Sequence, residues 1–499
     1  MGVVIRQSFK STVVTYVGVL LGAANLLYFF TAYLDPDEIG LRDVLLSVAM
    51  SLSIFTSLGL HSSMARFFPY FKDEQRQHNG YLLLCILIGG SGLLLFGGLF
   101  YLLRYYIMDI FDAKSAMVNE FLWLILPMTA FMMLQNILEI WARLHMRIVV
   151  NALIREILLR LIQTVLVVLY AQEYLSFDGF IIGFTASYAV VVLLLWLYIK
   201  KLGVLYINPS YLKWNSELMK NMARYSVWMM IGGAGIIINE RIDGFMLAWL
   251  AGLSLAGIYS ISFFIGTIIE MPRRAVSQLA TTLVSQYWKD NDHTAIGKIY
   301  RQASLNQMIL GGLLFLLVWA NVDALFLIIP NGEIYQQGKY VVFFIGLSRF
   351  FDMSNGINSE IIINSPYFKF NFLSIAFLGL VSFATNYFMI PRFGLVGAAA
   401  GSTLSIVLFN LLKGIFIWKK IGMQPFEKRS GWVLVTLTIV YGCSLFIPAP
   451  GTEFLGIVVN VFLRSAFIVI LLVYAIWRFK LSDEIIELMN RYLPRALQR

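Results

Sequence analysis

The sequence predicts an all-α polytopic membrane protein, and two observations lead to this fold class. Hydrophobic residues make up 59% of the 499 residues and charged residues only 13%, with a mean hydropathy of +0.76, whereas a soluble chain carries about 25% charged residues. The apolar residues also gather in runs of roughly 20 residues, the length with which a helix crosses the hydrocarbon core of a bilayer. These runs follow one another along the whole chain and leave no room for a separate soluble domain.

Charged or turn-rich breaks divide the apolar runs into about fourteen transmembrane helices. The first run follows Arg6 and Lys10 and is too long for the hydrophobic part of a signal peptide, so we expect it to be retained as a helix. The predicted spans are Val13–Tyr33, Val44–Leu60, Tyr81–Leu103, Phe121–Trp141, Leu153–Tyr170, Phe180–Ile199, Tyr225–Leu250, Ile258–Leu279, Leu305–Ile329, Tyr340–Ile363, Phe372–Ile390, Leu395–Trp418, Trp432–Phe446 and Leu455–Trp477.

Lysine and arginine are concentrated on one side of this arrangement. With the N-terminus inside, most of the 38 basic residues fall in cytoplasmic segments, including Lys200–Arg224 and Lys413–Arg429. The positive-inside rule therefore places both termini in the cytoplasm. The same distribution accounts for the net charge of +10, so we expect no nucleic acid as a partner.

An internal repeat is indicated by two pairs of glycine-containing turns. Gly40 corresponds to Gly257, and Gly179 corresponds to Gly397 at nearly the same separation. The repeat unit holds an even number of spans, so the two halves share one orientation and form two pseudo-symmetric six-helix lobes around a central cavity. The predicted parts are an N-terminal lobe (1–199), a cytoplasmic basic linker (200–224), a C-terminal lobe (225–420), two extra C-terminal helices (421–478) and a cytoplasmic amphipathic tail (479–499) capped by Ser482.

The seventh predicted span carries Asn239, Glu240, Arg241 and Asp243 near its middle. A charged side chain at mid-bilayer costs about 2.5–3.5 kcal/mol or more, so these groups must face partners or a hydrated interior. We expect this helix to line a polar cavity, with Glu240 and Asp243 taking up protons or sodium and Arg241 contacting a phosphate or a neighbouring acid. The alternative is a static ion-pair network that ties helices together.

The tenth predicted span repeats this pattern. Arg349, Asp352, Asn355 and Ser359 advance by three or four residues and form one stripe on a helix. The stripe either contacts the substrate, with Asp352 as an ion-coupling candidate, or contains an Arg349–Asp352 pair that neutralises itself.

Two further stripes run toward the cytoplasmic side and end in Arg143 and Arg274, which would suit an anionic head group because arginine binds phosphate through two parallel hydrogen bonds. They consist of Gln135, Asn136, Glu139 and Arg143 in the fourth span and of Glu270 and Arg274 in the eighth. Elsewhere we favour structural roles. Glu156 and Arg160 have the i,i+4 spacing of an ion pair, and Arg464 is expected to dock the extra helices.

Small and polar residues recur along the first span at Gly18, Gly22 and Asn25. Such a stripe either forms a close interhelical seam or lines an uncharged part of the cavity.

The sequence contains no spacing typical of a metal site or a catalytic centre. Cys85 and Cys443 fall inside predicted spans, which argues against disulfides and a cysteine metal site. The histidines lie near the cytoplasmic ends of spans and are expected to be ordinary surface residues. They are His61, His78, His145 and His293. We expect no metal and no cofactor apart from a coupling H⁺ or Na⁺.

The segment Met389–Gly401 reads Met-Ile-Pro-Arg-Phe-Gly-Leu-Val-Gly-Ala-Ala-Ala-Gly. It is similar to the Ile-Pro-x-Tyr-Gly-x-x-Gly-Ala-Ala turn between the eleventh and twelfth spans of polysaccharide flippases. The succession of six, six and two spans resembles the multidrug/oligosaccharidyl-lipid/polysaccharide (MOP) superfamily. Shorter matches at Asp37–Leu41, Asp243 and Asn355–Pro366 extend the resemblance over nearly the whole chain.

This resemblance favours the O-antigen and exopolysaccharide flippase branch and implies a transporter, not an enzyme, in the bacterial inner membrane. Such proteins are taken to move undecaprenyl-pyrophosphate-linked oligosaccharides to the outer leaflet by alternating access. The implied partners are the lipid-linked glycan, membrane lipid and other membrane proteins of glycan assembly. Lipid II flippases carry arginines in the first two spans, whereas Val13–Tyr33 contains no charge, which disfavours that branch.

Three alternatives stay open. A multidrug exporter of the same superfamily would bind organic cations, and its cavity should avoid the arginines predicted at 160, 241 and 349. A membrane glycosyltransferase or ligase would need a larger outer loop than the longest predicted ones, Arg104–Glu120 and Pro330–Lys339. A membrane scaffold would leave the ionisable residues within the spans without an evident purpose.

Overall fold

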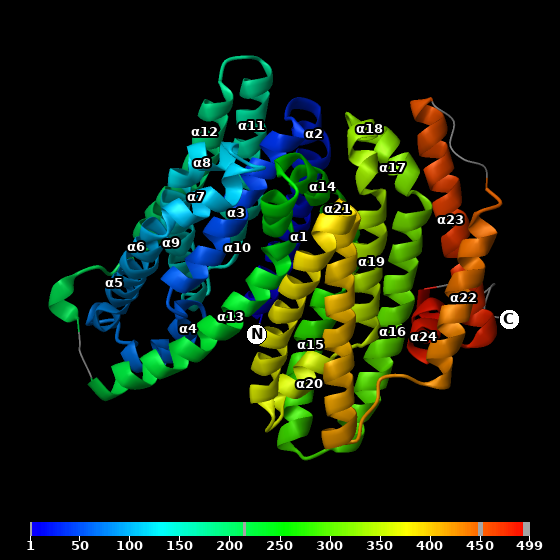
Figure 1. The fold of residues 1–499 in the computed structure, drawn as a ribbon. Coiled ribbons are helices and arrows are strands. Elements are labelled where there is room, and N and C mark those ends of the chain that lie inside the picture. The colour runs from blue at the N-terminus through cyan, green and yellow to red at the C-terminus, as the bar shows by residue number, and fades with distance from the viewer. Residues whose placement is uncertain (1, 213–215, 448–452, 493–499) are drawn as a thin grey trace. The chain divides into compact units, whose positions relative to one another are not determined.

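The computed structural model describes residues 2–212, 216–447 and 453–492, and within these ranges the chain is helical and contains no strand (Figure 1). The predicted all-α class is therefore confirmed. The chain divides into two compact units, Met1–Gly257 and Ile258–Arg499. The predicted lobes and their limits stay predictions.

The described residues of the first unit form thirteen helices and the start of a fourteenth, and short π-helical turns join several of them. Its helices are α1 (Gly2–Ala24), α2 (Phe30–Tyr33), α3 (Pro36–Thr56), α4 (Leu60–Phe71), α5 (Tyr81–Gly92), α6 (Gly98–Leu102), α7 (Arg104–Asp112), α8 (Met117–Phe121), α9 (Ile125–Leu144), α10 (Val149–Ala152), α11 (Leu159–Ala171), α12 (Phe177–Lys201) and α13 (Ser216–Leu250), followed by α14 (Leu253–Thr267). The π-helical turns are Asn25–Phe29, Leu93–Gly97 and Leu153–Leu158.

Local chemistry sets where the main helices of this unit begin. Asp35 caps α3, and its backbone N–H donates to Glu38 Oε2 over 2.9 Å, completing a capping box before Pro36. Ser176 caps α12 in a similar way, because its hydroxyl accepts the N–H of Gly179 at 3.2 Å.

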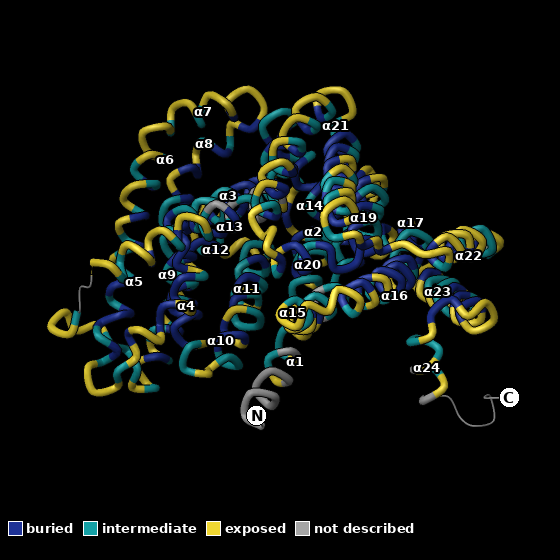
Figure 2. The backbone as a smooth tube through the Cα atoms, turned by 90° about the horizontal axis from the view of Figure 1, so that it is seen from below, coloured by how far each residue is buried: buried dark blue, intermediate teal, exposed yellow. Residues whose placement is uncertain are grey.

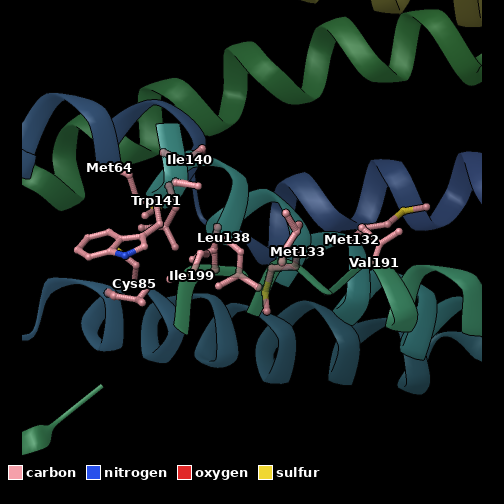
Figure 3. Close-up of a cluster of buried hydrophobic side chains, with 14 of the residues drawn as sticks. Met64, Cys85, Met132, Met133, Leu138, Ile140, Trp141, Val191 and Ile199 are labelled. Carbon is pink, nitrogen blue, oxygen red and sulfur yellow. The ribbon is translucent and has the colours of Figure 1, made fainter. Parts of the chain in front are cut away.

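The core of the first unit lies between α3, α4, α5, α9 and α12, where Trp141, Met64 and Cys85 pack together (Figure 3). The indole N–H of Trp141 donates to the carbonyl of Val204 at 2.9 Å. This polar atom is therefore satisfied although the side chain is fully buried.

One expectation about this region is wrong. His78 is not a surface histidine: it is only 2% exposed, and its ring packs edge-on against Phe68 and Trp141. Its Nε2 lies 3.3 Å from Nε2 of His145. The left-handed backbone of residues 77–79 turns the ring inward, and sequence periodicity cannot reveal such a turn.

The two turns that the repeat equates pack against each other at Gly40 and Gly257. A Cβ on Gly40 would lie 2.1 Å from the carbonyl oxygen of Leu253, and one on Gly257 would lie 2.0 Å from that of Pro36. Only glycine fits at either position, because no real Cβ approaches a backbone oxygen so closely.

In the part of the second unit that the structure describes, the rest of α14 is followed by ten further helices. They are α15 (Arg273–Lys289), α16 (His293–Ala320), α17 (Val322–Ile328), α18 (Gly332–Tyr335), α19 (Lys339–Ser354), α20 (Asn358–Asn364), α21 (Phe368–Ile421), α22 (Lys428–Ser444), α23 (Phe454–Phe479) and α24 (Asp483–Tyr492). Helix α19 packs against both α16 and α21.

Helix α21 is one long helical segment interrupted at Gly394, where φ is 54° and ψ is −128°. This break follows Pro391 and separates the predicted eleventh and twelfth spans. Arg464 on α23 donates to the carbonyls of Ala320 at 2.6 Å and Ile447 at 3.0 Å. It thus ties α23 to neighbouring segments, as its docking role predicts.

The surface is that of a membrane protein. Among the described residues, nine helical segments are long and apolar enough to cross a bilayer, and large apolar side chains are exposed along outward helix faces such as those of α5, α6, α22 and α23 (Figure 2). Apolar surfaces of this kind are stable in contact with lipid tails, whereas their exposure to water would be unfavourable. Each of the fourteen predicted spans falls on helical segments, and their number as membrane crossings stays a prediction.

Candidate functional site

A cavity of about 680 Å³ opens within the first unit, which is within the size range of small-molecule sites. The part that comes from α3, α4 and α13 mixes apolar side chains with serines and a histidine, whereas most of the polar groups come from α9, the π turn before α11, α11 and α12. The lining residues are Leu46, Met50, Ser53, Ile54, Ser57, Gly59, Leu60, His61, Ser62, Met132, Gln135, Asn136, Ile137, Ile140, Arg155, Glu156, Leu159, Arg160, Gln163, Tyr188, Met229 and Gly233.

Two arginines and one glutamate form the charged part of this lining. Arg160 Nη2 lies 3.0 Å from Glu156 Oε2, which confirms the predicted i,i+4 ion pair. Arg155 Nη2 lies 2.9 Å from the other oxygen of the same carboxylate. Glu156 is therefore shared between two cations, and Arg155 reaches a second acid, Glu139, at 2.9 Å.

Arg160 retains unused hydrogen-bonding capacity. Its Nη1 atom is buried and makes no hydrogen bond to any described residue. A buried donor without an acceptor is costly, and the side chain as a whole stays 27% exposed toward the cavity. The unpaired Nη1 packs against Gly18 of α1, so an anion in the cavity would reach the guanidinium through its exposed part.

The small residues of the first span make room for Arg160. A Cβ on Gly18 would lie 2.8 Å from Arg160 Nη1, and one on Gly22 would lie 3.0 Å from Nε. Asn25 Nδ2 donates to the backbone carbonyl of Arg160 at 2.8 Å, and Thr164 Oγ1 donates to Asn25 Oδ1 at 2.6 Å. The stripe is therefore a packing seam that fixes an arginine, and none of its three residues lines the cavity.

The stripe predicted on the fourth span is divided by the structure. Gln135 and Asn136 line the cavity, and Gln135 Nε2 donates to Glu139 Oε1 at 2.8 Å. Arg143 is exposed at the end of α9 and is not among the lining residues.

The predicted residues of the seventh span lie on α13, beyond the part that lines this cavity. Met229 and Gly233 are the α13 residues of the lining. Asp243 is buried at 3% exposure, Glu240 is exposed and Arg241 is half-buried; no described ion pair includes Arg241. The side chain of Asn239 lies outside the described part of the structure.

In the second unit, the stripe of the tenth span enters an ion-pair network. Arg349 Nη1 lies 2.8 Å from Glu270 Oε2, and Arg273 lies 3.6 Å from Oε1 of the same residue. Arg273 also forms an ion pair with Asp352, whose Oδ1 accepts the side-chain N–H of Asn410 at 2.9 Å. Arg349 therefore pairs with an acid and Asp352 with a base on other segments, and the two residues do not pair with each other.

The network continues into α20 and α21. Asn358 Nδ2 donates to Asn410 Oδ1 at 2.8 Å, and Lys413 Nζ donates to Ser359 Oγ at 2.7 Å. Lys413 is only 2% exposed, and its ammonium lies 3.8 Å from the ring centre of Phe409. A buried lysine held by one hydroxyl and one ring is an expensive arrangement, which indicates a functional group.

Two other predicted site residues, Asn355 and Arg274, belong to this unit. Asn355 is buried and donates to the carbonyl of Phe351, on its own helix, at 2.8 Å. The side chain of Arg274 is not among those the structure describes. Arg155, Arg273 and Lys413 lie near predicted span ends, in basic segments that the positive-inside rule assigns to the cytoplasm, and sequence reasoning missed them for this reason. The contacts of Arg155 with Glu139 and of Arg273 with Asp352 join distant segments, so no spacing along one helix signals them.

Comparison with known proteins supplies the context for these two charged regions. Residues 4–283 match the model of a family described as polysaccharide biosynthesis protein. An uncharacterized membrane protein of Methanocaldococcus jannaschii is 23% identical over 260 residues. That match covers 51% of this chain and 50% of the relative, so the chain aligns with about half of the curated protein.

Solved structures share the fold at low sequence identity. The lipid II flippase MurJ in an inward closed conformation has a TM-score of 0.76 at 11% identity, covering 95% of this chain and 99% of that one. A multidrug resistance transporter of the MATE family, inward-facing, has a TM-score of 0.62 at 14% identity over 84% and 96% of the two chains. A MOP superfamily transporter from Pyrococcus furiosus has a TM-score of 0.56 at 15% identity over 84% and 95%.

Proposed function

Because the chain belongs to the polysaccharide biosynthesis protein family of MOP superfamily membrane transporters, we propose that it flips an undecaprenyl-pyrophosphate-linked oligosaccharide between membrane leaflets. The substrate moves from the inner to the outer leaflet of the bacterial cell membrane by alternating access. The chain carries out transport without chemical conversion, alongside the membrane proteins that assemble the glycan.

The observation that carries this proposal is the partly exposed guanidinium of Arg160 in the lining of the cavity of the first unit. A pyrophosphate offers several oxygen acceptors, and arginine binds phosphate through paired, charge-assisted hydrogen bonds. Arg155 lies beside it through the shared Glu156. A polar wall with amide and hydroxyl groups suits the sugar units that follow the phosphates.

The same geometry disfavours the multidrug exporter. An organic cation needs an acid that is not already neutralised. In the described part of the cavity, the lining carboxylate of Glu156 is bound by two arginines, and Glu139 behind it is bound by Arg155. An organic cation in the cavity would lie close to the positively charged Arg155 and Arg160, and both nearby glutamates already have arginine partners.

We place ion coupling in acids of the second unit and of α13. Asp352 lies in the network with Arg273, and Glu360 has one buried carboxylate oxygen without a hydrogen bond to any described residue. Uptake of H⁺ or Na⁺ by Asp352, or by Asp243 and Glu240 on α13, would change the pairing of the arginines. In this scheme Arg241, Arg349, Arg143, Arg274, Asn239 and Asn355 are substrate contacts at successive stages of transport.

The test is deletion in the native host followed by analysis of lipid-linked intermediates in the two leaflets. We expect the lipid-linked glycan to accumulate on the cytoplasmic leaflet, and the intact chain to restore its delivery. Unchanged carriers together with raised drug sensitivity would instead support the exporter. Reporter fusions to either end test the proposed cytoplasmic location of both termini.

A further inference from the structure

A second pocket, of about 690 Å³, lies within the second unit and is separate from the charged network described above. It lies where α15 ends, α16 begins, α20 passes into α21 and α21 ends (Figure 1). Four chain segments therefore converge on one space, and its size is typical of a small-ligand site.

The charge of this pocket is positive. Lys289 and Lys420 line it, and its lining residues, all within the described ranges, include no carboxylate. The nearby acid Asp292 is engaged elsewhere, because its Oδ1 accepts the N–H of Ala295 at the start of α16 over 2.9 Å. Neither lysine takes part in an ion pair with a described residue. Two ammonium groups facing one space without an acid favour an anion.

One of the lining residues, Trp288, carries a polar atom that lacks a partner. The indole Nε1 of Trp288 is buried and makes no hydrogen bond to any described residue. The ring itself is held in place by His293, whose ring meets it edge-on at 5.0 Å between centroids. A ligand oxygen that reached this N–H from the pocket would supply the acceptor that it lacks.

We propose that this pocket binds a phosphate-bearing ligand, with Lys289 and Lys420 contacting the phosphate oxygens and Trp288 donating its indole N–H to an oxygen of the same ligand. Lysine is a common phosphate ligand because it acts as a compact point charge. Amide and hydroxyl groups of Asn291, Asn364 and Ser285 in the lining suit the hydroxyl groups of a glycerol or sugar attached to the phosphate. The ligand is either a soluble phosphate ester or the head group of a phospholipid, and both present this chemistry.

The helix-end location of the lysines supplies a matched control. Lys419 and Lys420 both lie in the last turn of α21, where a cation stabilises the helix dipole, yet only Lys420 lines the pocket. If the two lysines act only on helix stability, Lys419→Gln and Lys420→Gln should change the melting temperature and the ligand affinity similarly. If Lys420 binds the ligand, only Lys420→Gln should lower the ligand affinity.

The experiment titrates the purified full chain in a neutral detergent with sn-glycerol 3-phosphate and, separately, with short-chain phosphatidylglycerol below its micelle concentration. We expect saturable binding that the Lys289→Gln/Lys420→Gln variant weakens at least about tenfold, since charged hydrogen bonds contribute about 1.5–3 kcal/mol. Trp288→Phe should weaken it by a smaller factor, and Lys419→Gln should leave it unchanged. Melting temperatures of all variants show whether each is folded.

Equal affinity for the two probes would identify the phosphate ester as the recognised part. Much tighter binding of phosphatidylglycerol would identify a membrane lipid as the source. Binding of neither probe, or binding that the double lysine variant leaves unchanged, would overturn the proposal.

Discussion

The two units handle their charged residues in opposite ways. In the first unit, Arg155 and Arg160 stand at the edge of a cavity and share the carboxylate of Glu156. In the second, Arg273 and Arg349 are held in a network of ion pairs with Glu270 and Asp352. The presence of an arginine within a membrane span therefore does not by itself indicate an anionic substrate. The arginine can bind a substrate only if its acid partners leave some of its N–H donors available.

The largest loss of stability should appear when one partner of the ion-pair network in the second unit is removed. Arg273→Ala leaves Asp352 buried without its cation, and breaking a buried pair from one side costs about 3–5 kcal/mol. We expect a much lower melting temperature and little protein in the membrane. Adding Asp352→Asn to this variant should restore part of the loss, because the charge left behind is removed. A single variant as stable as the parent chain would show that the network is dispensable.

Arg160→Gln should act on transport and not on stability. Glu156 keeps Arg155 as a partner, so no carboxylate is stranded, while the phosphate loses hydrogen bonds of about 1.5–3 kcal/mol, equivalent to roughly tenfold or more in affinity. Glycan delivery to the outer leaflet should fall accordingly at unchanged protein level. Arg160→Lys should recover only part, since lysine cannot form the paired contact. Normal delivery in Arg160→Gln would remove Arg160 from the mechanism.

The seam under Arg160 offers a gentler perturbation of the cavity. A Cβ on Gly18 would lie 2.6 Å from Glu156 Cβ and 2.8 Å from the Glu156 carbonyl oxygen, so Gly18→Ala should shift the first helix and cost about 1–3 kcal/mol. Gly98→Ala, which meets no atom within 4 Å, is the control and should be neutral or slightly stabilising. Equal melting temperatures of the two variants would contradict the close approach.

The smallest effects are expected for Arg241→Ala and Arg349→Ala. Each should lower glycan delivery by a smaller factor than Arg160→Gln, because neither side chain lines the cavity of the first unit. The protein should still be present in the membrane, because Arg349→Ala leaves Glu270 with Arg273 as a partner. Delivery is measured from surface glycan, and membrane protein from quantitative blotting. If both variants deliver glycan normally, these two arginines have no role in transport.

The sequence was sufficient for the helical class and for local pairs, since these depend on composition and on spacing along one helix. The Glu156–Arg160 pair and the break near Gly394 are examples. It was insufficient where contacts join distant segments. Arg155 reaches Glu139 from a π-helical turn that no pattern announces.

The same limit explains the residues that were missed or misplaced in the second unit and at His78. Lys413 lies near the end of a span and was attributed to a loop, although it is buried against Ser359. His78 is turned inward by a left-handed backbone that its neighbours do not signal. Span ends are where hydropathy is least informative, because a cation there can either enter water or fold back into the protein.

The most direct test of the account is a flipping assay with the purified chain in proteoliposomes that contain a fluorescent undecaprenyl-pyrophosphate-linked oligosaccharide. The intact chain should move the lipid between leaflets, and Arg160→Gln, reconstituted at the same level, should do so at least about tenfold more slowly. Equal rates for the two proteins, or no movement with the intact chain under an imposed proton or sodium gradient, would contradict it.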